Sequence, residues 1–273
     1  MTMEDNNQAF YDANRAMWDE YAHINYKSEM YGMKEFRTTK NKLNPLELGE
    51  VGAVAGKSLL HLQCHFGMDT LSWAHLGAQV TGVDFSPEAI GIARKLSADL
   101  KLSGRFICCP LFDLPQHLDE QFDIVYTSYG VLTWLDDIRK WGQLVARYLK
   151  PGGMFYIAEF HPFAMMFDDA GDEFRLRYSY FDSTPQEFKV EGSYADKTAQ
   201  TCQKVDYEWM HTMGDIVSAI AGAGLRIEFM HEFTQTVYEQ FPFVRKVDKH
   251  YWAAPEGSPD VPLMFSIKAW KDR

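Results

Sequence analysis

The chain of 273 residues is long enough to bury a sizeable core, as one large domain or as one domain with an added lobe. Its 38 acidic residues outnumber its 27 lysines and arginines, and the net charge of −11 argues against binding nucleic acid through the phosphates. A hydrophobic share of 46% and an aromatic share of 15% argue against general disorder.

The cysteines and the N-terminus bear on the compartment. None of Cys64, Cys108, Cys109 and Cys202 has C-x-x-C spacing, and adjacent cysteines rarely bridge each other, so we expect reduced thiols and no metal site. The first residues include early acids and no apolar run, which predicts no signal peptide. No stretch approaches ~18 uninterrupted apolar residues, so we expect a soluble cytoplasmic protein with no membrane partner.

Residues 1–50 have helical character and are rich in aromatic side chains. The rings belong to Phe10, Tyr11, Trp18, Tyr21, Tyr26, Tyr31 and Phe36. Two interpretations stay open, because these helices could simply pack against the core or could form a lid over a ligand.

Strand-like and helical patterns alternate over residues 58–160. Helices are expected over 69–76, over 87–100 with Ser86 as the N-cap and Pro87 in the first turn, and over 136–150. The strands are expected at 58–63, 79–84, 105–109, 122–128 and 153–160. This alternation predicts an α/β fold with a Rossmann-like, doubly wound, mostly parallel sheet.

Beyond residue 160 the pattern changes to amphipathic strands. Segments 174–180, 188–192 and 204–211 alternate aromatic and polar residues, which predicts two or three antiparallel strands with an aromatic face. A helix over 213–224 and strands over 225–233 and 262–270 would complete a seven-stranded sheet with an antiparallel last strand. The expected units are N-terminal helices at 1–50, the Rossmann-like domain at 51–162 and 212–273, and an inserted β lobe at 163–211.

The predicted ligand site lies beyond the carboxyl ends of the strands, where such sheets bind their ligands. Asp84 ends the second strand about 20 residues after the first loop, the separation at which an acid binds a ribose, so an adenosine-type ligand is expected. A pyrophosphate needs a glycine-rich loop, but Gln63, His65 and Met68 crowd the approach and Asp69 adds a negative charge. The loop therefore suits a ligand tail with an ammonium and a carboxylate.

Four segments resemble the class I S-adenosylmethionine-dependent methyltransferases. "LLHLQCHFG" resembles the family's first motif, often D/E-x-G-x-G-x-G, with His61 in place of the acid and only Gly67 left of the glycines. "VTGVDFSPEAI" is similar to the second motif, and "FDIVYTSYGVLTWLDD" and "LKPGGMFYIAEFHP" are similar to the fourth-strand and fifth-strand motifs. The resemblance covers residues 58–160 and, more weakly, the final sheet elements, and it points to the small-molecule branch of the family.

The resemblance implies S-adenosylmethionine as cofactor and S-adenosylhomocysteine as product. Asp84 should bind the ribose, Phe85 with Leu111 or Phe112 should contact the adenine, and the Thr127 carbonyl should meet the methionine amino group. Gln63, Cys64 and Gly67 should line the methionine tail, and the cofactor set also includes His61 and Ser86. Pro110 stands where the family often has an acid that binds the adenine amino group, and Asp113 is a possible substitute. Three alternatives stay open: Asp84 as a helix-start acid, Gln63 and His65 as solvated turn residues, and Cys64 as a core filler.

Methyl transfer needs a positioned acceptor and the exclusion of water, and it needs a base only where the acceptor loses a proton. His161 follows the fifth strand and is the first candidate for that base, although it could equally be a structural histidine. Tyr129 and Glu159 are the other candidates in the catalytic set. The weaker candidates are Trp134, His211 and His231.

The fourth-strand loop reads "TSYG" and lacks the N/D-P-P-Y pattern that methylates nucleobase amino groups, so we expect no nucleic-acid partner. The aromatic segments favour a planar or aromatic small-molecule acceptor in an enclosed pocket. The alternatives are a non-catalytic protein that binds S-adenosylmethionine, an NAD-dependent oxidoreductase, and other S-adenosylmethionine chemistry such as cyclisation. A homodimer could form through the aromatic strand face.

Overall fold

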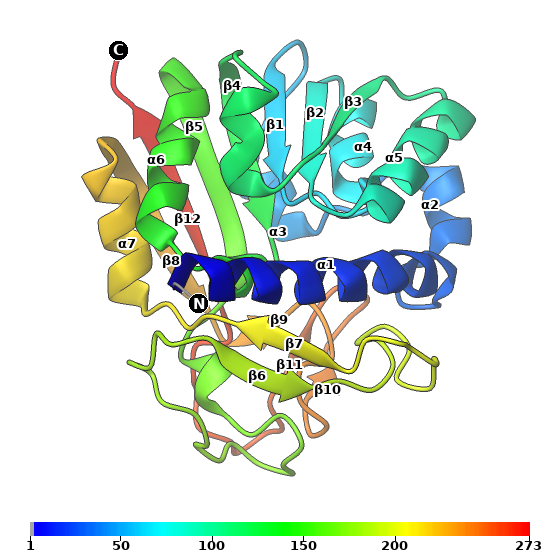
Figure 1. The fold of residues 1–273 in the computed structure, drawn as a ribbon, viewed down its shortest axis with the longest axis vertical. Helices are drawn as coiled ribbons and strands as arrows, with labels where there is room; N and C mark the ends of the chain where they lie inside the picture. The colour runs from blue at the N-terminus through cyan, green and yellow to red at the C-terminus, as the bar shows by residue number, and fades with distance from the viewer. Residues whose placement is uncertain (1–2) are drawn as a thin grey trace.

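The computed structural model describes residues 3–273, and a seven-stranded sheet forms its centre (Figure 1). The strand order is β3-β2-β1-β4-β5-β12-β8, and only β12 runs antiparallel to its neighbours. The strands are β1 Ser58–Leu62, β2 Gln79–Asp84, β3 Gly104–Cys108, β4 Phe122–Ser128, β5 Leu149–Phe160, β8 Leu225–Phe233 and β12 Met264–Lys271. The prediction of a mostly parallel Rossmann-like sheet with an antiparallel last strand is confirmed.

Helices cover both faces of the sheet. They are α1 Met3–Lys27, α2 Met33–Thr39, α3 Pro45–Val51, α4 Met68–His75, α5 Pro87–Leu100, α6 Ile138–Tyr148 and α7 Met213–Gly222, with short 3-10 turns η1 Leu111–Gln116, η2 Leu132–Trp134 and η3 Ala164–Met166. Side chains alternate along the strands, so Leu59 and Ile124 face α3 and α4 while Leu60 and Val125 face α6 and α7. No helix within residues 3–273 combines the length and the apolar character that a membrane crossing requires.

The local sequence explains where the helices around the site begin. The Ser86 hydroxyl accepts a hydrogen bond from the Ala89 amide, and Pro87 occupies the first turn of α5, as predicted. Asp137 caps α6 in the same way through the Lys140 amide. Gly142 in α6 faces α7 so closely that an added Cβ would lie 2.4 Å from the Ala219 carbonyl oxygen.

The inserted lobe contains one hairpin, in which β6 Gln186–Lys189 pairs antiparallel with β7 Val205–Glu208. The prediction of a further strand over 174–180 is wrong, because this segment forms turns and loop. Its apolar side chains are not arranged on one strand face: Phe174 packs among Phe167, Phe241 and Phe243, whereas Leu176 is 59% exposed. Alternation alone did not distinguish a strand from a loop whose rings enter a separate aromatic cluster.

A second small sheet was not predicted. Strands β9 Gln235–Thr236, β10 Arg245–Lys246 and β11 Trp252–Ala253 form it within the long connection between β8 and β12. Strands this short carry too few residues for a period-2 pattern to be recognised.

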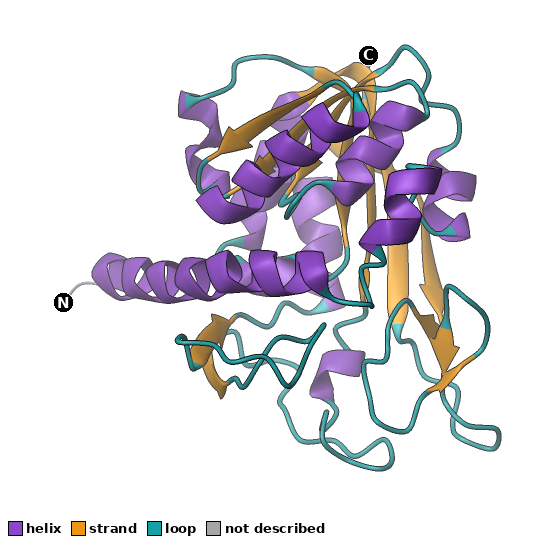
Figure 2. Ribbon diagram, turned by 90° about the vertical axis from the view of Figure 1, so that its right-hand side faces the viewer, coloured by secondary structure: helices purple, strands orange, loops and turns teal. Residues whose placement is uncertain are grey.

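Helix α1 lies between the sheet domain and the loop-rich lobe (Figures 1 and 2). On the lobe side, the Asn14 side chain exchanges two hydrogen bonds with the backbone of Tyr207. On the sheet side, Asp19 accepts a hydrogen bond from the Ser86 hydroxyl at the start of α5. The first helix therefore joins two parts of the molecule that are far apart in sequence.

Candidate cofactor and acceptor site

A cavity of about 2200 Å³ lies at the carboxyl ends of β1, β2 and β4, next to α1 and the lobe. Ligand pockets usually measure about 300–1,000 Å³, so this cavity has room for a cofactor and a second molecule. Most of the site residues predicted from sequence line it: His61, Gln63, Cys64, Gly67, Asp84, Phe85, Leu111, Phe112 and Tyr129. The predicted residues that do not line it are Ser86, Thr127, Glu159 and His161.

Three residues of the loop between β1 and α4 have a left-handed backbone, although the loop contains only one glycine. Gln63, His65 and Gly67 have φ of 55°, 51° and 77°. Only Gly67 lacks room for a side chain, because an added Cβ would lie 2.8 Å from the Phe106 ring. At the other two positions the left-handed backbone costs roughly 1–2 kcal/mol each.

Hydrogen bonds hold those two strained residues in place. The Gln63 side-chain amide donates to the Val131 carbonyl oxygen at 2.9 Å, and the His65 backbone amide donates to Asp84 at 2.7 Å. Burial lowers the pKa of the His65 imidazole to about 3, so the ring is neutral. The alternative that Gln63 and His65 are solvated turn residues is therefore wrong.

Asp84 is 8% exposed and ends β2 at the cavity wall. One carboxylate oxygen accepts the His65 amide and the other accepts the Ser86 amide at 3.0 Å. Each oxygen keeps a lone pair that can accept a further hydrogen bond. Burial raises the pKa of this carboxyl group to about 6, which outweighs the lowering by the backbone amides.

An apolar ledge follows Asp84 along the cavity. Phe85 comes directly after β2, and Leu111 and Phe112 begin the 3-10 turn η1 after β3. Lys140 lies over the Phe112 ring, with Nζ 4.6 Å from the ring centroid. Asp113 also lines the cavity. It is the possible substitute for the acid that binds the adenine amino group in many methyltransferases and that is replaced here by Pro110.

The side chains of four predicted cofactor residues are engaged by neighbouring protein groups. The buried His61 ring lies with Nδ1 2.8 Å from the Thr70 hydroxyl, and burial lowers its pKa to about 3. The Cys64 thiol points at the sheet, where an added Cβ on Gly82 would lie 2.8 Å from Sγ, so the core-filler interpretation of its side chain fits best. The hydroxyls of Thr127 and Ser86 are fully buried and donate to the Leu62 carbonyl oxygen and to Asp19.

The Glu159 carboxylate is 4% exposed and holds a loop of the cavity wall from outside the cavity. It accepts hydrogen bonds from four backbone amides, those of Gly130, Val131, Leu132 and Phe160. Burial raises its pKa, while these amides favour the ionised form. The contacts favour a loop-positioning role over the predicted catalytic one.

His161 is also held by protein groups outside the cavity. Its Nδ1 accepts the Phe163 amide at 3.0 Å, and its Nε2 lies 2.9 Å from Glu232. Burial lowers the pKa of the ring against the opposing effect of Glu232. Among the weaker candidates, His211 Nε2 donates to the Leu135 carbonyl oxygen at 2.7 Å and His231 pairs with Glu50, and neither residue lines the cavity.

Tyr129 is the member of the predicted catalytic set that reaches the cavity. Its backbone has φ of 36°, and its buried hydroxyl has no hydrogen-bond partner among the described residues. Glu47 is fully buried nearby with a free oxygen, Oε2, and burial raises the pKa of its carboxyl group to about 8. At the start of α4, Asp69 accepts a hydrogen bond from the Ser128 hydroxyl at 3.3 Å.

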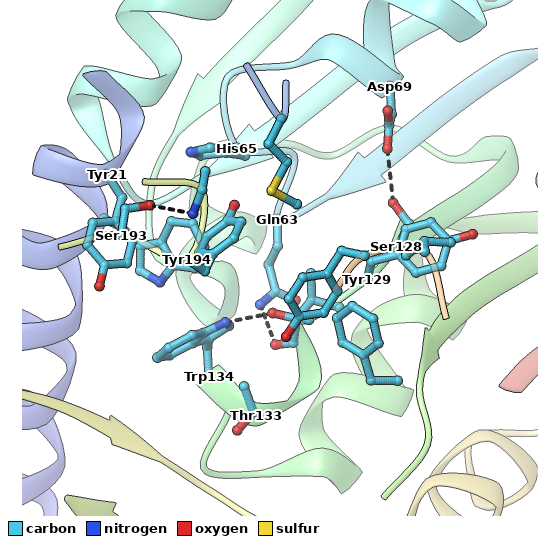
Figure 3. A pocket seen from close by; sticks show the side chains of 18 of the residues that line it. Tyr21, Gln63, His65, Asp69, Ser128, Tyr129, Thr133, Trp134, Ser193 and Tyr194 are labelled. Atoms are coloured by element: carbon cyan, nitrogen blue, oxygen red, sulfur yellow. Dashed lines mark hydrogen bonds between the residues drawn. The ribbon is translucent and has the colours of Figure 1, made fainter. Parts of the chain in front are cut away.

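Sequence reasoning missed the wall opposite Tyr129, because its residues come from distant segments. Figure 3 shows Tyr21, His65 and Tyr194 on one side of the cavity, Tyr129 on the other, and Gln63 between them. The lobe also contributes two carboxylates of β7 to the lining, Asp206 and Glu208. Gln63 and His65 belong to the first motif, but no local motif marks Tyr21, Tyr194, Asp206 or Glu208.

Comparison with known proteins agrees with this architecture. A family model described as a methyltransferase domain matches residues 60–157. The chain is 30% identical over 141 residues to a ubiquinone biosynthesis O-methyltransferase of Bordetella pertussis, covering 50% of this chain and 58% of that protein. A protein of the same name from Xanthomonas oryzae is 33% identical over 119 residues, covering 42% and 49%. The chain thus spans about half the length of these curated relatives.

Solved structures share the fold at lower identity. An S-adenosylmethionine-dependent methyltransferase from Mesorhizobium loti has a TM-score of 0.60 and 21% identity, covering 83% of this chain and 96% of that one. The glycopeptide N-methyltransferase MtfA, solved with sinefungin, has a TM-score of 0.54 and 17% identity, covering 84% and 85%. The central residues 60–157 therefore match a methyltransferase domain, and the chain has the fold of the S-adenosylmethionine-dependent methyltransferases.

Proposed function

We propose that the protein transfers a methyl group from S-adenosylmethionine to a small-molecule acceptor that is planar or aromatic, with S-adenosylhomocysteine as the product. The observation that carries this proposal is the buried Asp84 carboxylate at the end of β2, which opens on a cavity large enough for two ligands. Its free lone pairs suit the two hydroxyls of a ribose, and the apolar ledge beside it suits a purine.

The cofactor would lie across the carboxyl ends of β2, β1 and β4. Asp84 would bind the ribose, and Phe85, Leu111 and Phe112 would contact the adenine. The backbone of the 63–67 loop would line the methionine tail. Asp69 at the start of α4 disfavours a pyrophosphate and favours an ammonium group, which supports S-adenosylmethionine over NAD.

When bound, S-adenosylmethionine supplies an electrophilic methyl group. The chain's own contribution is to hold an acceptor in line and to exclude water, and α1 and the lobe enclose the cavity in a way that serves both needs. Tyr129 faces the cavity as a neutral phenol, since burial holds its pKa well above the usual range, so it can orient an acceptor through a hydrogen bond. Direct catalysis by His161 or Glu159 stays a prediction.

The acceptor class is inferred from the cavity wall. Trp18 lies with its ring centroid 5.4 Å from that of Trp134 and 6.1 Å from that of Tyr194, so aromatic faces border the space beside the cofactor region. The curated relatives are named for O-methylation in ubiquinone biosynthesis, and that name belongs to those proteins. Both observations support a planar or aromatic acceptor. A non-catalytic protein that binds S-adenosylmethionine is the remaining alternative.

The first test concerns the ribose carboxylate. Asp84→Ala should weaken S-adenosylhomocysteine binding by about 10- to 100-fold, since each hydrogen bond to a charged group contributes roughly 1.5–3 kcal/mol. Calorimetric titration measures this change, with Asp119→Ala as the control because Asp119 is fully exposed and outside the cavity. Unchanged affinity in Asp84→Ala would mean that the ribose is bound elsewhere.

The second test concerns turnover. Incubation with methyl-labelled S-adenosylmethionine and a panel of small metabolites should label one or more members of the panel. Label confined to peptides or oligonucleotides would contradict the acceptor class. Binding of the cofactor with no S-adenosylhomocysteine produced from any member would favour the non-catalytic alternative.

A further inference from the structure

Strand β7 presents two carboxylates to the cavity. Tyr207 lies between these two acids, Asp206 and Glu208, in sequence, and its side chain points away from the cavity. The centroid of its ring lies 4.2 Å from that of Phe10 on α1, and its backbone forms two hydrogen bonds with Asn14. Because side chains alternate along a strand, Asp206 and Glu208 project from the opposite face, and both line the cavity.

These carboxylates lack the partners that buried acids usually have. Asp206 is 5% exposed, and its Oδ1 has no hydrogen-bond partner among the described residues. Glu208 accepts one hydrogen bond, from the Thr133 hydroxyl at 2.6 Å. Within residues 7–273, whose side chains are described, neither acid forms an ion pair with a lysine, arginine or histidine. Burying carboxylates without such pairing is unfavourable, so the site as it stands lacks a compensating positive charge.

Aromatic rings border the same space. Trp18 and Tyr21 come from α1, Trp134 follows Thr133 in η2, and Tyr194 comes from the lobe. Burial, and after it the charge of Asp206, raises the pKa of the Tyr21 phenol to about 12. Faces of tryptophan and tyrosine attract organic cations, and the attraction grows when water is excluded.

Two further oxygens on the cavity wall are unpartnered acceptors. The Gln63 and Gln240 side chains donate through Nε2, at 2.9 Å to the Val131 carbonyl oxygen and at 3.9 Å to the Met165 sulfur, which leaves each Oε1 without a donor. The N–H groups of a ligand can donate to oxygens of this kind.

We propose that Asp206 and Glu208, with the Trp18, Tyr21 and Trp134 rings, form a subsite for an organic ammonium ion carried by the acceptor. The proposal rests on the proposed function only in taking that ligand to be the methyl acceptor. The subsite narrows the acceptor from planar or aromatic molecules in general to aromatic molecules that bear a protonated amine or a quaternary ammonium group.

A matched pair of probes tests the subsite. Phenethylamine carries the ammonium and 2-phenylethanol is its neutral counterpart, and both are titrated into the full chain saturated with S-adenosylhomocysteine, with tryptophan fluorescence or calorimetry as the readout. The amine should bind at least tenfold more tightly than the alcohol. In the double variant Asp206→Asn, Glu208→Gln, the two affinities should agree within about twofold.

Controls separate this proposal from the others. Asp172→Asn removes an exposed acid of the same lobe outside the cavity and should keep the preference for the amine. S-adenosylhomocysteine affinity should be unchanged in the double variant, because Asp84 is intact. If the wild-type protein binds no S-adenosylhomocysteine, the proposed function is refuted. Titrating phenethylamine and 2-phenylethanol into the protein without S-adenosylhomocysteine then still tests the subsite.

Two results would overturn the subsite: equal binding of amine and alcohol by the wild type, or a preference that survives in the double variant. If the double variant does not fold, Trp134→Leu provides a second measurement that keeps both acids. It should weaken the amine more than the alcohol, since only the cation gains from the ring face. Equal weakening of both probes would contradict a cation subsite.

Discussion

Asp84 combines burial with hydrogen bonds from two backbone amides, and burial raises its pKa to about 6. A ribose hydroxyl donates to a carboxylate far better than to a neutral acid, so bound cofactor favours the ionised form. In the free protein the carboxyl group is protonated below about pH 6. Cofactor binding must then displace that proton, which weakens affinity as pH falls.

We therefore expect S-adenosylhomocysteine affinity to be constant above about pH 7 and to fall by up to tenfold per unit below about pH 6. Calorimetric titration from pH 5 to pH 8 measures this profile. In Asp84→Asn the weaker binding should show no such fall across the same range. A flat wild-type profile would mean that this carboxylate does not titrate against the cofactor.

Glu159 illustrates how a residue can be conspicuous in sequence and still lie outside the cavity. Glu159→Gln replaces one acceptor oxygen by an amide that meets N–H groups, so the free energy of unfolding should fall by about 2–3 kcal/mol. Urea denaturation measures the change, and Glu232→Gln is the control, because its carboxyl group is half exposed beside His161 and such pairs contribute little. A catalytic base at Glu159 would instead abolish turnover with stability unchanged.

At the scale of elements, α1 is the connection between the cofactor domain and the lobe. Asn14 is 1% exposed and satisfies both backbone groups of Tyr207. The lid interpretation of residues 1–50 stays a prediction. It is supported by the α1 residues that line the cavity, among them Tyr11 and Trp18, and by the place of this helix between the sheet domain and the lobe (Figure 2). The other interpretation, that these helices pack against the core, is compatible with a lid.

Asn14→Ala should lower the free energy of unfolding by about 2 kcal/mol, because two hydrogen bonds are lost and a backbone amide and a carbonyl lose their partners. Hydrogen exchange of the β7 amides should accelerate with it. Gln8→Ala, at an exposed position of the same helix, should change neither quantity. Equal exchange rates in β7 for both variants would show that α1 does not hold the hairpin.

Across the whole molecule, the charge of −11 governs which partners can approach. We expect no binding of labelled single- or double-stranded DNA or RNA by fluorescence polarisation at about 150 mM salt, because a protein of this net negative charge is repelled by the phosphates. Micromolar binding under these conditions would contradict the predicted absence of nucleic-acid partners. The predicted homodimer stays a prediction, although segment 174–180 does not contribute a strand to the face it would use.

The sequence by itself determined the parts of this protein that depend on local chemistry. The alternation of strands and helices, the Ser86 cap and the placement of Asp84 at the end of a strand follow from residue types a few positions apart. That Gln63, His65 and Asp69 disfavour a pyrophosphate stays a prediction from the same local chemistry.

The tertiary structure alone decided which side chains reach the cavity. Glu159 lies near the end of β5 and His161 follows that strand, but their side chains contact backbone amides and Glu232. Asp206 instead reaches the cavity from a hairpin about 120 residues beyond Asp84 in sequence. The burial of a side chain and its hydrogen-bond partners depend on which residues the fold places next to it. A linear pattern carries no record of such long-range neighbours.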